Sequence, residues 1–484
     1  MLRLKYLTVL LIMVLFASVS KPQNFNDALR LSELEIVNGV RSLGMGNAYT
    51  ALSNDFSASL FNPAGFGLIK SLELTSGVDI NSFNSETVFF NNKSDDNISK
   101  LGLNQLGFAL PIPTVRGSLV LGFGFNQTKN FNYAISFDGF NNGSNSLIQE
   151  LTYDNDDIAY ELGLSYPTYD NDNNYTGDVT EINGKLNQDG KIKQEGSLNS
   201  WLFSGAIEVQ KDIFVGVTLN IINGDLTRNR EYYESDIDDY YDASVLLDPN
   251  EPLTSDFETF YINDIIKWDI SGWNATFGIL AKMGENFNIG LTYELPKEFN
   301  IKENYLVNAY SDFGSGYRFV LDPPIDNRIE YDISTPYKLT AGAAFLKDNF
   351  TLSADVSYID YTEMEFTEGL DVFDQIENNK DIKEIFTDVF NINAGFEYQI
   401  PYSDFYVRGG FIYMPSPYKE DSSDFDKKYI TAGLTVDSGR NIVFNLAYAY
   451  GWWKDIGDNY GSNVSRTFQD NSKSNLMLGI KYRF

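Results

Sequence analysis

From about residue 71 onward, apolar and polar residues alternate with a period of two, which is typical of β-strands with one apolar face. In one such segment Phe444, Leu446 and Tyr448 share one face, and Asn445 and Ala447 share the other. Each predicted strand is long enough to cross a membrane at a tilt, which takes roughly 9–11 residues. The fourteen predicted strands lie near residues 71–82, 101–112, 117–131, 200–210, 213–224, 272–283, 286–297, 337–346, 349–361, 389–400, 405–414, 428–437, 441–453 and 474–484.

The connections between the predicted strands alternate between short and long. Turns such as residues 211–212 and 347–348 are short, and the next connection along the chain after each of them is a long polar segment. A soluble β-sandwich would show the same two-residue period. Short turns at one end and long loops at the other are typical of an outer-membrane barrel, and they favour that fold. The long connections cover about residues 83–100, 132–199, 225–271, 298–336, 362–388, 415–427 and 454–473.

The first twenty residues have the three parts of a secretory signal. Arg3 and Lys5 precede an apolar run over residues 6–16, and small residues follow it. The run is too short for a spanning helix, which needs ~20 residues. We therefore expect export, with a signal peptide over residues 1–20, an N-terminal hatch over 21–69 and a transmembrane barrel over 70–484.

Composition supports a barrel and excludes several classes of function. The chain has 31 Tyr and 36 Phe, enough for the aromatic girdles of a membrane barrel, and a net charge of −31 that argues against nucleic acid as a partner. It has no Cys and no His, which excludes disulfides and Ser-His or Cys-His catalysis. Aspartate-based chemistry stays open, but we predict no enzyme, no cofactor and no metal. A calcium-like spacing at residues 170–181 has Tyr175 where the turn needs glycine.

A stretch rich in glycine and other small residues, 39–68, precedes the first predicted strand. A fourteen-stranded barrel has a lumen too wide for side chains alone to fill, because about eight strands already suffice for a packed interior. We expect this stretch to fill the lumen, with glycines on the strands making room for it. Strand twist is the alternative explanation of these glycines. They are Gly216, Gly278, Gly290, Gly342, Gly395, Gly433 and Gly479.

The same stretch resembles the hatch signature of the FadL/TodX family of outer-membrane transport proteins. The resemblance implies a fourteen-stranded barrel with an internal hatch in the outer membrane of a Gram-negative bacterium, and passive transport of hydrophobic molecules such as long-chain fatty acids. The implied partners are the hydrophobic ligand, outer-membrane lipids and lipopolysaccharide, and the barrel assembly machinery, whose C-terminal signal Phe484 resembles. The hatch residues that carry the resemblance are Arg41, Gly44, Met45, Gly46, Asn62, Pro63 and Ala64.

In that family the ligand leaves through a side opening at an inward kink in the third strand. Gly122 and Gly124 lie in the third predicted strand and are candidates for this lateral gate, although strand glycines often mark ordinary bulges.

Aromatic residues and one cation are candidates for ligand contacts. Phe123 and Phe125 flank the gate glycines, and Tyr305 and Phe313 lie in a long outer loop. Loop packing and the outer girdle are the alternative roles of the loop aromatics. Arg408 faces the lumen if its neighbours face lipid, where it would suit a carboxylate ligand. Pairing with Glu397 on the adjacent strand is the favoured interpretation, because buried charges are normally paired.

Two further functions use the same scaffold. Some FadL-like barrels bind exported proteins or the translocon in a secretion system, and the long acidic loops here would suit that role. An adhesin or a purely structural barrel is a third possibility. The intact Asn-Pro-Ala triplet at Asn62 favours the transporter.

Overall fold

The structure is a computed structural model that describes most of the chain. The predicted signal peptide, residues 1–20, lies outside the described residues. Among the described residues, no helix is long and apolar enough to cross a membrane. The described ranges are 23–36, 39–153, 157–439, 441–461 and 464–484.

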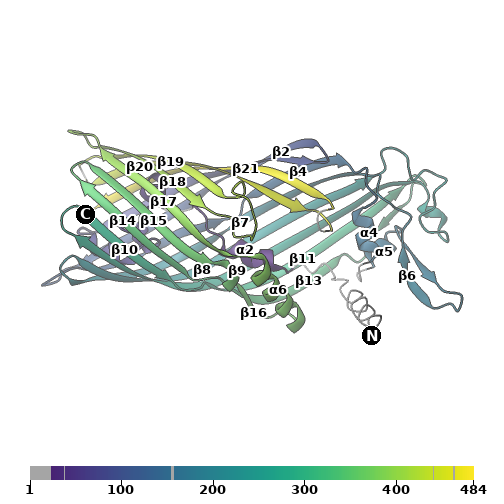
Figure 1. The fold of residues 1–484 in the computed structure, drawn as a ribbon, viewed down its shortest axis with the longest axis horizontal. Coiled ribbons are helices and arrows are strands. Elements are labelled where there is room, and N and C mark those ends of the chain that lie inside the picture. The colour runs from purple at the N-terminus through teal and green to yellow at the C-terminus, as the bar shows by residue number, and fades with distance from the viewer. Residues whose placement is uncertain (1–22, 37–38, 154–156, 440, 462–463) are drawn as a thin grey trace, which may run out of the picture.

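The strands close into one antiparallel barrel of 14 strands, as predicted (Figure 1). The last strand pairs with the first, so that Arg483 stands opposite Glu73. Closure leaves no free sheet edge in the lipid, where each unpaired backbone group would cost several kcal/mol. The crossing strands are β1 (Glu73–Phe89), β2 (Asn92–Ile112), β3 (Leu119–Asn130) continued by β4 (Tyr133–Phe140), β7 (Asn187–Gln210), β8 (Ile213–Ser235), β9 (Phe257–Met283), β10 (Phe287–Glu294) continued by β11 (Glu298–Phe313), β13 (Ile325–Ser334) continued by β14 (Lys338–Lys347), β15 (Phe350–Asp360), β17 (Asp388–Gln399), β18 (Phe405–Met414), β19 (Lys427–Asp437), β20 (Ile442–Asp458) and β21 (Arg466–Arg483).

Side chains alternate between the outer face and the lumen, which confirms the face assignment made from the pattern. On β20, Phe444 and Tyr448 are 47% and 44% exposed, whereas Ala447 and Ala449 are buried. The outer set is apolar because it meets lipid, and the inner set is small because other parts of the chain fill the lumen.

The barrel wall is taller on one side than on the other (Figure 1). The strands β7, β8 and β9 contain 24, 23 and 27 residues, whereas β15, β17 and β18 contain 11, 12 and 10. Much of the predicted loops 132–199, 225–271 and 298–336 is therefore strand, and the prediction was wrong there. Beyond the membrane neither strand face has to be apolar, so the alternation fades while the pairing continues.

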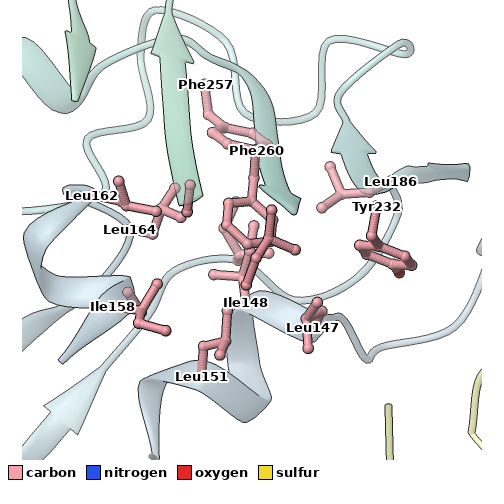
Figure 2. Packing of buried hydrophobic residues seen from close by; sticks show 14 of the residues in the cluster. Leu147, Ile148, Leu151, Ile158, Leu162, Leu164, Leu186, Tyr232, Phe257 and Phe260 are labelled. Atoms are coloured by element: carbon pink, nitrogen blue, oxygen red, sulfur yellow. The ribbon is translucent and has the colours of Figure 1, made fainter. Parts of the chain in front are cut away.

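A cluster of loops and short helices covers the outer mouth on the tall side. We call the described part of residues 147–186 together with residues 241–257 the distal cap. Leu147, Ile148 and Leu151 point toward Phe260 and Tyr232 of the barrel wall (Figure 2). The cap therefore shares one hydrophobic core with the outer ends of the wall strands. Its elements are α4 (Leu147–Thr152), α5 (Ile158–Glu161), β5 (Tyr166–Tyr169), β6 (Tyr175–Val179) and η3 (Pro252–Thr254).

The remaining elements lie in the N-terminal segment and in two further loops. The N-terminal segment contains α2 (Phe25–Ser32), α3 (Val40–Gly44), η1 (Phe56–Ser59) and η2 (Pro63–Leu68). The loops contain β12 (Arg318–Val320), η4 (Tyr361–Glu363), β16 (Glu365–Glu368) and α6 (Val372–Ile385).

Candidate functional site: the hatch and the cavity beyond it

The Asn-Pro-Ala motif starts η2 and fastens it to the wall. The Asn62 side chain accepts a hydrogen bond from the Ala64 amide at 3.1 Å, which is the usual role of asparagine before a helical turn. Its Nδ2 donates to the carbonyl oxygens of Thr50 and Ile279, at 2.9 and 3.0 Å. Because Ile279 belongs to β9 and Thr50 to the hatch, this one side chain joins the hatch to itself and to the barrel. Pro63 fixes the first residue of η2.

The inward glycines lie where the hatch backbone touches the wall. A Cβ atom added to Gly278 would lie 2.0 Å from Asn62 Oδ1, and one added to Gly395 would lie 2.0 Å from the carbonyl oxygen of Met45. Contacts this short exclude any side chain, because the hatch occupies the space. At the other five strand glycines a hatch atom would lie 2.3–3.0 Å from an added Cβ, which agrees with the prediction that they make room for the hatch. Their neighbours in the hatch belong to residues 40–64.

Gly46 is the one hatch glycine whose backbone also demands glycine. Its φ is +60°, and an added Cβ would lie 2.7 Å from the Ala394 carbonyl oxygen and 2.7 Å from the Phe411 amide nitrogen. Next to it, Met45 is fully buried in a small cluster with Tyr49. The Gly-Met-Gly motif therefore combines a tight turn with a buried anchor.

Three charged side chains form a buried network between the hatch and the wall. Arg41 of α3 donates to both carboxylate oxygens of Glu397 on β17, at 2.9 and 3.0 Å. Arg408 of β18 donates to the same carboxylate at 2.6 Å and to Thr435 at 2.5 Å. The pairing of Arg408 with Glu397 is as expected, so Arg408 is occupied and buried beside the hatch. The contact between Arg41 and Glu397 was not predicted from the sequence.

Asp355 of β15 is a contact that sequence reasoning missed. It accepts hydrogen bonds from the backbone amides of Tyr49 and Thr50, both at 2.8 Å. The signal that could have found it is its position, because an acidic residue at an inward position in the middle of a membrane strand needs a partner.

A cavity of about 610 Å³ lies on the outer side of the hatch, between α2 and the wall. Apolar groups on its lining include Phe131, Ile266 and Trp453. The helix α2 closes one side of it. Its Asp27 is paired with Arg30 at 2.6 Å, yet burial raises the pKa of Asp27 to about 6, with Arg30 opposing.

Charged residues of the wall face this cavity in unequal numbers. Arg228 and Arg230 of β8 both pair with the single carboxylate of Asp264 on β9, Arg228 at 3.0 Å. Burial lowers the pKa of Arg228. Burial also acts on Arg230, but Asp264 outweighs it and raises that pKa. Both guanidinium groups stay charged at neutral pH. The two arginines therefore share one negative charge. Over the whole lining the charges balance, with six Lys or Arg and six Asp or Glu residues, so the positive excess is confined to this pair.

The wall beside this cavity is interrupted in the third crossing strand. The β2–β3 ladder ends at the pair Gln105–Asn126, and β4 pairs only with β7 among the described strands. Tyr133 of β4 packs its ring 5.1 Å from that of the inward-facing Phe83 and donates to Gln469 on β21 at 2.8 Å. The chain therefore bends inward after β3. It leaves residues 92–104 of β2 without a ladder on that side, and we call this place the wall gap.

Ion pairs bridge the wall gap on the outer surface. Lys100 of β2 pairs with Glu195 of β7 at 2.8 Å, and Lys191 of β7 pairs with Asp96 of β2 at 2.9 Å. Side-chain charges thus replace the missing backbone ladder.

The predicted gate glycines do not lie at this gap. Gly122 and Gly124 sit in the regular part of β3, opposite Ala109 and Gly107 of β2. Cβ atoms added to them would contact the rings of the hatch residues Phe66 and Phe56, at 2.6 and 2.4 Å. They serve the hatch contact, and the bend comes later in the chain, between β3 and β4.

The predicted ligand-contact aromatics separate into three places. Phe123 and Phe125, predicted as ligand contacts, face outward and pack against Trp201, away from the cavity beyond the hatch. Phe313 is buried in the core of the distal cap. Tyr305 lines the cavity beyond the hatch.

Comparison with known proteins gives the family and the fold. A sequence profile described as "Outer membrane protein transport protein (OMPP1/FadL/TodX)" matches residues 35–484. Among curated protein sequences none matches.

Several solved structures share the fold at low sequence identity. The crystal structure of the P. putida toluene transporter TodX is 13% identical, covers 93% of this chain and 99% of its own, and has a TM-score of 0.56. A Pseudomonas aeruginosa FadL homologue is 13% identical, with coverage of 94% and 100% and a TM-score of 0.56. The Ralstonia pickettii toluene transporter TbuX is 16% identical, with coverage of 92% and 98% and a TM-score of 0.51. The profile match spans nearly the whole chain, and we conclude that this chain belongs to the FadL/TodX family of outer-membrane transport proteins.

Proposed function

We propose that this outer-membrane barrel carries hydrophobic molecules passively, with the hatch and the wall gap controlling the path. The observation that carries the proposal is the cavity of about 610 Å³, which lies on the outer side of the hatch and is lined in part by Tyr133 and Ile135 of β4, where the third crossing strand bends inward. A ligand held there contacts β4, which packs against β2 without forming a backbone ladder with it. The hatch fills the lumen below it, so an open aqueous pore is not required.

The exit in this proposal is lateral, through the wall gap into the membrane. Opening it requires that two ion pairs separate, Lys100 with Glu195 and Lys191 with Asp96, and that Ala134 of β4 leaves its contact with Phe83 and Ile98. Ion pairs at the surface stabilise a contact by only ~0–1 kcal/mol, and of these four side chains only Asp96 is largely buried. Displacing the hatch would instead break the buried contacts of Arg41, Asn62 and the strand glycines. The lateral path is therefore the easier one.

The ligand class that the cavity suits is an apolar chain with a carboxylate, such as a long-chain fatty acid. Arg228 and Arg230 share one carboxylate, and guanidinium groups bind a further carboxylate through two parallel hydrogen bonds. Phe131, Ile266 and Trp453 offer apolar contacts in the same cavity. A neutral aromatic hydrocarbon would leave this charge unused.

Binding of oleate and of its methyl ester to the purified barrel tests the ligand class. In the Arg228→Gln variant we expect oleate to bind ~10-fold or more weakly, because a hydrogen bond to a charged group contributes about 1.5–3 kcal/mol. The methyl ester should bind equally to both proteins. Arg318→Gln, at an exposed arginine beyond the cavity, is the matched control. Equal loss for both ligands would refute the role of the arginine in binding the carboxylate.

Uptake into proteoliposomes tests transport itself, and a cross-link tests the lateral exit. The chain has no Cys, so the variant Lys100→Cys with Glu195→Cys carries one reactive pair across the wall gap. A short bifunctional maleimide should block uptake in this variant. The same reagent on Glu86→Cys with Asp470→Cys, which are ladder partners on β1 and β21, should not. Unimpaired uptake after cross-linking the gap would refute the lateral exit. If deleting the protein leaves fatty-acid uptake intact and blocks protein secretion, the secretion-partner alternative is correct instead.

A further inference from the structure

The first turn of α6 exposes three large apolar side chains. Val372, Phe373 and Ile376 are 65%, 82% and 62% exposed. The short helix α4 of the distal cap shows the opposite, because its Leu147 and Ile148 are 6% and 0% exposed. An apolar group of this size on one helical turn indicates a contact surface.

The orientation of α6 is fixed by its other face. Asn379 accepts from the Phe366 amide at 2.8 Å and donates to the Phe366 carbonyl at 2.9 Å, and Gln375 donates to the same carbonyl at 2.8 Å. Ile382 is fully buried. Just beyond the helix, the Phe386 ring packs 5.9 Å from that of Phe25, at the start of α2. The helix is therefore held against the barrel, with its first turn directed away from it.

The height of α6 along the barrel follows from the lengths of the strands beside it. The crossing strand that precedes it in the chain, β15, has 11 residues. This is about the number that a tilted strand needs to cross the membrane. Asp360, at the end of β15, therefore marks the outer surface of the bilayer. Tyr358 and Phe390 pair their rings at 5.2 Å on the outer face just below it, as in an aromatic girdle.

Helix α6 begins twelve residues after that point, on the low side of the wall. In Figure 1 it lies beside the ends of the short strands, whereas α4 and β6 lie at the far end of the molecule. The exposed turn is therefore next to the lipid-facing surface of the barrel.

We propose that the first turn of α6 inserts into the outer leaflet of the membrane and rests at the level of the headgroups and upper acyl chains. The apolar turn continues the lipid-facing surface that ends at Tyr358 and Phe390. The charged residues Asp374 and Glu377 lie beside this turn, and Lys380 and Glu384 lie in the later turns. The contact is therefore confined to the side chains of Val372, Phe373 and Ile376, with the charged groups at the level of the headgroups and water. The contact is independent of whether the barrel transports a ligand.

Site-directed spin labelling tests this contact in the complete, membrane-inserted barrel. Because the chain has no Cys, Phe373→Cys places a single nitroxide at the exposed turn. The label is compared in proteoliposomes for relaxation by oxygen, which concentrates in lipid, and by a water-soluble nickel chelate. Leu352→Cys, 47% exposed on the outer face of β15, is the lipid reference. Ile237→Cys, 62% exposed beyond the tall strand β8, is the water reference.

We expect the label at position 373 to be relaxed by oxygen at least threefold more than the label at position 237, and by the nickel chelate correspondingly less. A label at 373 that matches the water reference would overturn the proposal. A label shielded from both reagents would also overturn it, because that result indicates a protein partner or a second copy of the chain. The substituted side chain is exposed, so the variant should fold like the native protein.

Discussion

The two ends of the lumen are closed by different sets of contacts. The hatch combines several small apolar clusters with polar groups and with backbone pressed against glycine, as at Gly395, where an added Cβ would lie 2.0 Å from a hatch carbonyl. The distal cap is held by apolar side chains such as Ile148 and Phe260, both fully buried. The hatch depends strongly on the direction and length of its contacts, whereas the distal cap depends mainly on the apolar area removed from water.

This difference follows from what surrounds each closure. Within the membrane the lumen is lined by inward polar and small residues, because the apolar residues of each strand face lipid. A hatch there makes only small apolar clusters with the wall, such as that of Phe56 and Phe66 with Val120, and adds buried hydrogen bonds and ion pairs to them. Outside the membrane the cap is surrounded by water, where burial of apolar area stabilises a fold at roughly 25 cal/mol per Å². The hatch should therefore be sensitive to single polar changes, and the cap to changes in side-chain volume.

The largest expected effect comes from removing the carboxylate that the hatch and the wall share. Glu397→Ala leaves Arg41 and Arg408 close together without their common partner. Breaking a buried ion pair by removing one partner is destabilising by ~3–5 kcal/mol. We expect a loss of this size in the free energy of unfolding in urea, and faster amide exchange in residues 40–50. Asp312→Asn, at the exposed pair with Arg318, is the control and should change neither.

An unchanged stability in Glu397→Ala would mean that water or another group replaces the carboxylate. The hatch would then be held mainly by its backbone contacts, and the contrast between hatch and cap would be weaker.

The barrel was predictable from the sequence because its rules are local. The two-residue period, the inward glycines and the Arg408–Glu397 pair all follow from which face a residue occupies and which strand is its neighbour. The same rule also predicts that Phe123 faces outward, because it lies two residues from Leu121 and so on the same face of the strand. Its predicted role as a ligand contact did not take this rule into account.

The remaining parts of the site depend on contacts that the period does not encode. The two amides that bind Asp355 come from a segment about 300 residues earlier in the chain, and only barrel closure brings them together. The sharing of Asp264 by two arginines likewise depends on the register of β8 against β9. Outside the membrane the pattern weakens, because water meets both faces of the tall strands.

The next largest effect is expected in the distal cap. Ile148→Ala removes a fully buried side chain from its core (Figure 2). Such a change is destabilising by ~2–5 kcal/mol, depending on how far the neighbours close the cavity. We expect faster amide exchange in residues 147–152 and an unchanged melting temperature of the barrel. Ile237→Ala, at an exposed side chain, is the control. A barrel that melts earlier in Ile148→Ala would show that cap and barrel unfold together.

A smaller effect is expected where the hatch touches the strand glycines. Gly278→Ala places a Cβ at 2.0 Å from Asn62 Oδ1 and 2.9 Å from Pro63 Cδ, so η2 must move. Inserting atoms into a packed site is destabilising by ~1–3 kcal/mol. Gly205→Ala is the matched control, because its added Cβ would meet only Leu121 Cδ2 at 3.7 Å. Comparing the losses in unfolding free energy of the two variants separates the contact with the hatch from the general effect of alanine in a strand. Equal effects would show that the glycine serves only the strand.

The effect that is smallest per step of the change, here one pH unit, is a dependence of the cap on pH. Glu234, near the outer end of β8, accepts hydrogen bonds from the amides of Leu147 and Ile148 and from Gln188 and Tyr232. Burial raises the pKa of its carboxyl from 4.5 to about 7, and these donors oppose the shift. The folded cap therefore binds the proton more tightly than the open cap does. Its contribution to stability is fully present below pH 4.5 and is lost as the pH rises through about 7.

Amide exchange of α4, corrected for the intrinsic effect of pH, measures this contribution. In the native protein the opening free energy of α4 should fall between pH 4.5 and 7, by at most about 1.4 kcal/mol per pH unit, and then level off. Glu234→Gln cannot titrate, so its opening free energy should be flat across the same range. Glu150→Gln, on the exposed side of the same helix, should keep the native slope. A slope that persists in Glu234→Gln would assign the pH dependence to another group. Glu234 would then have no part in it.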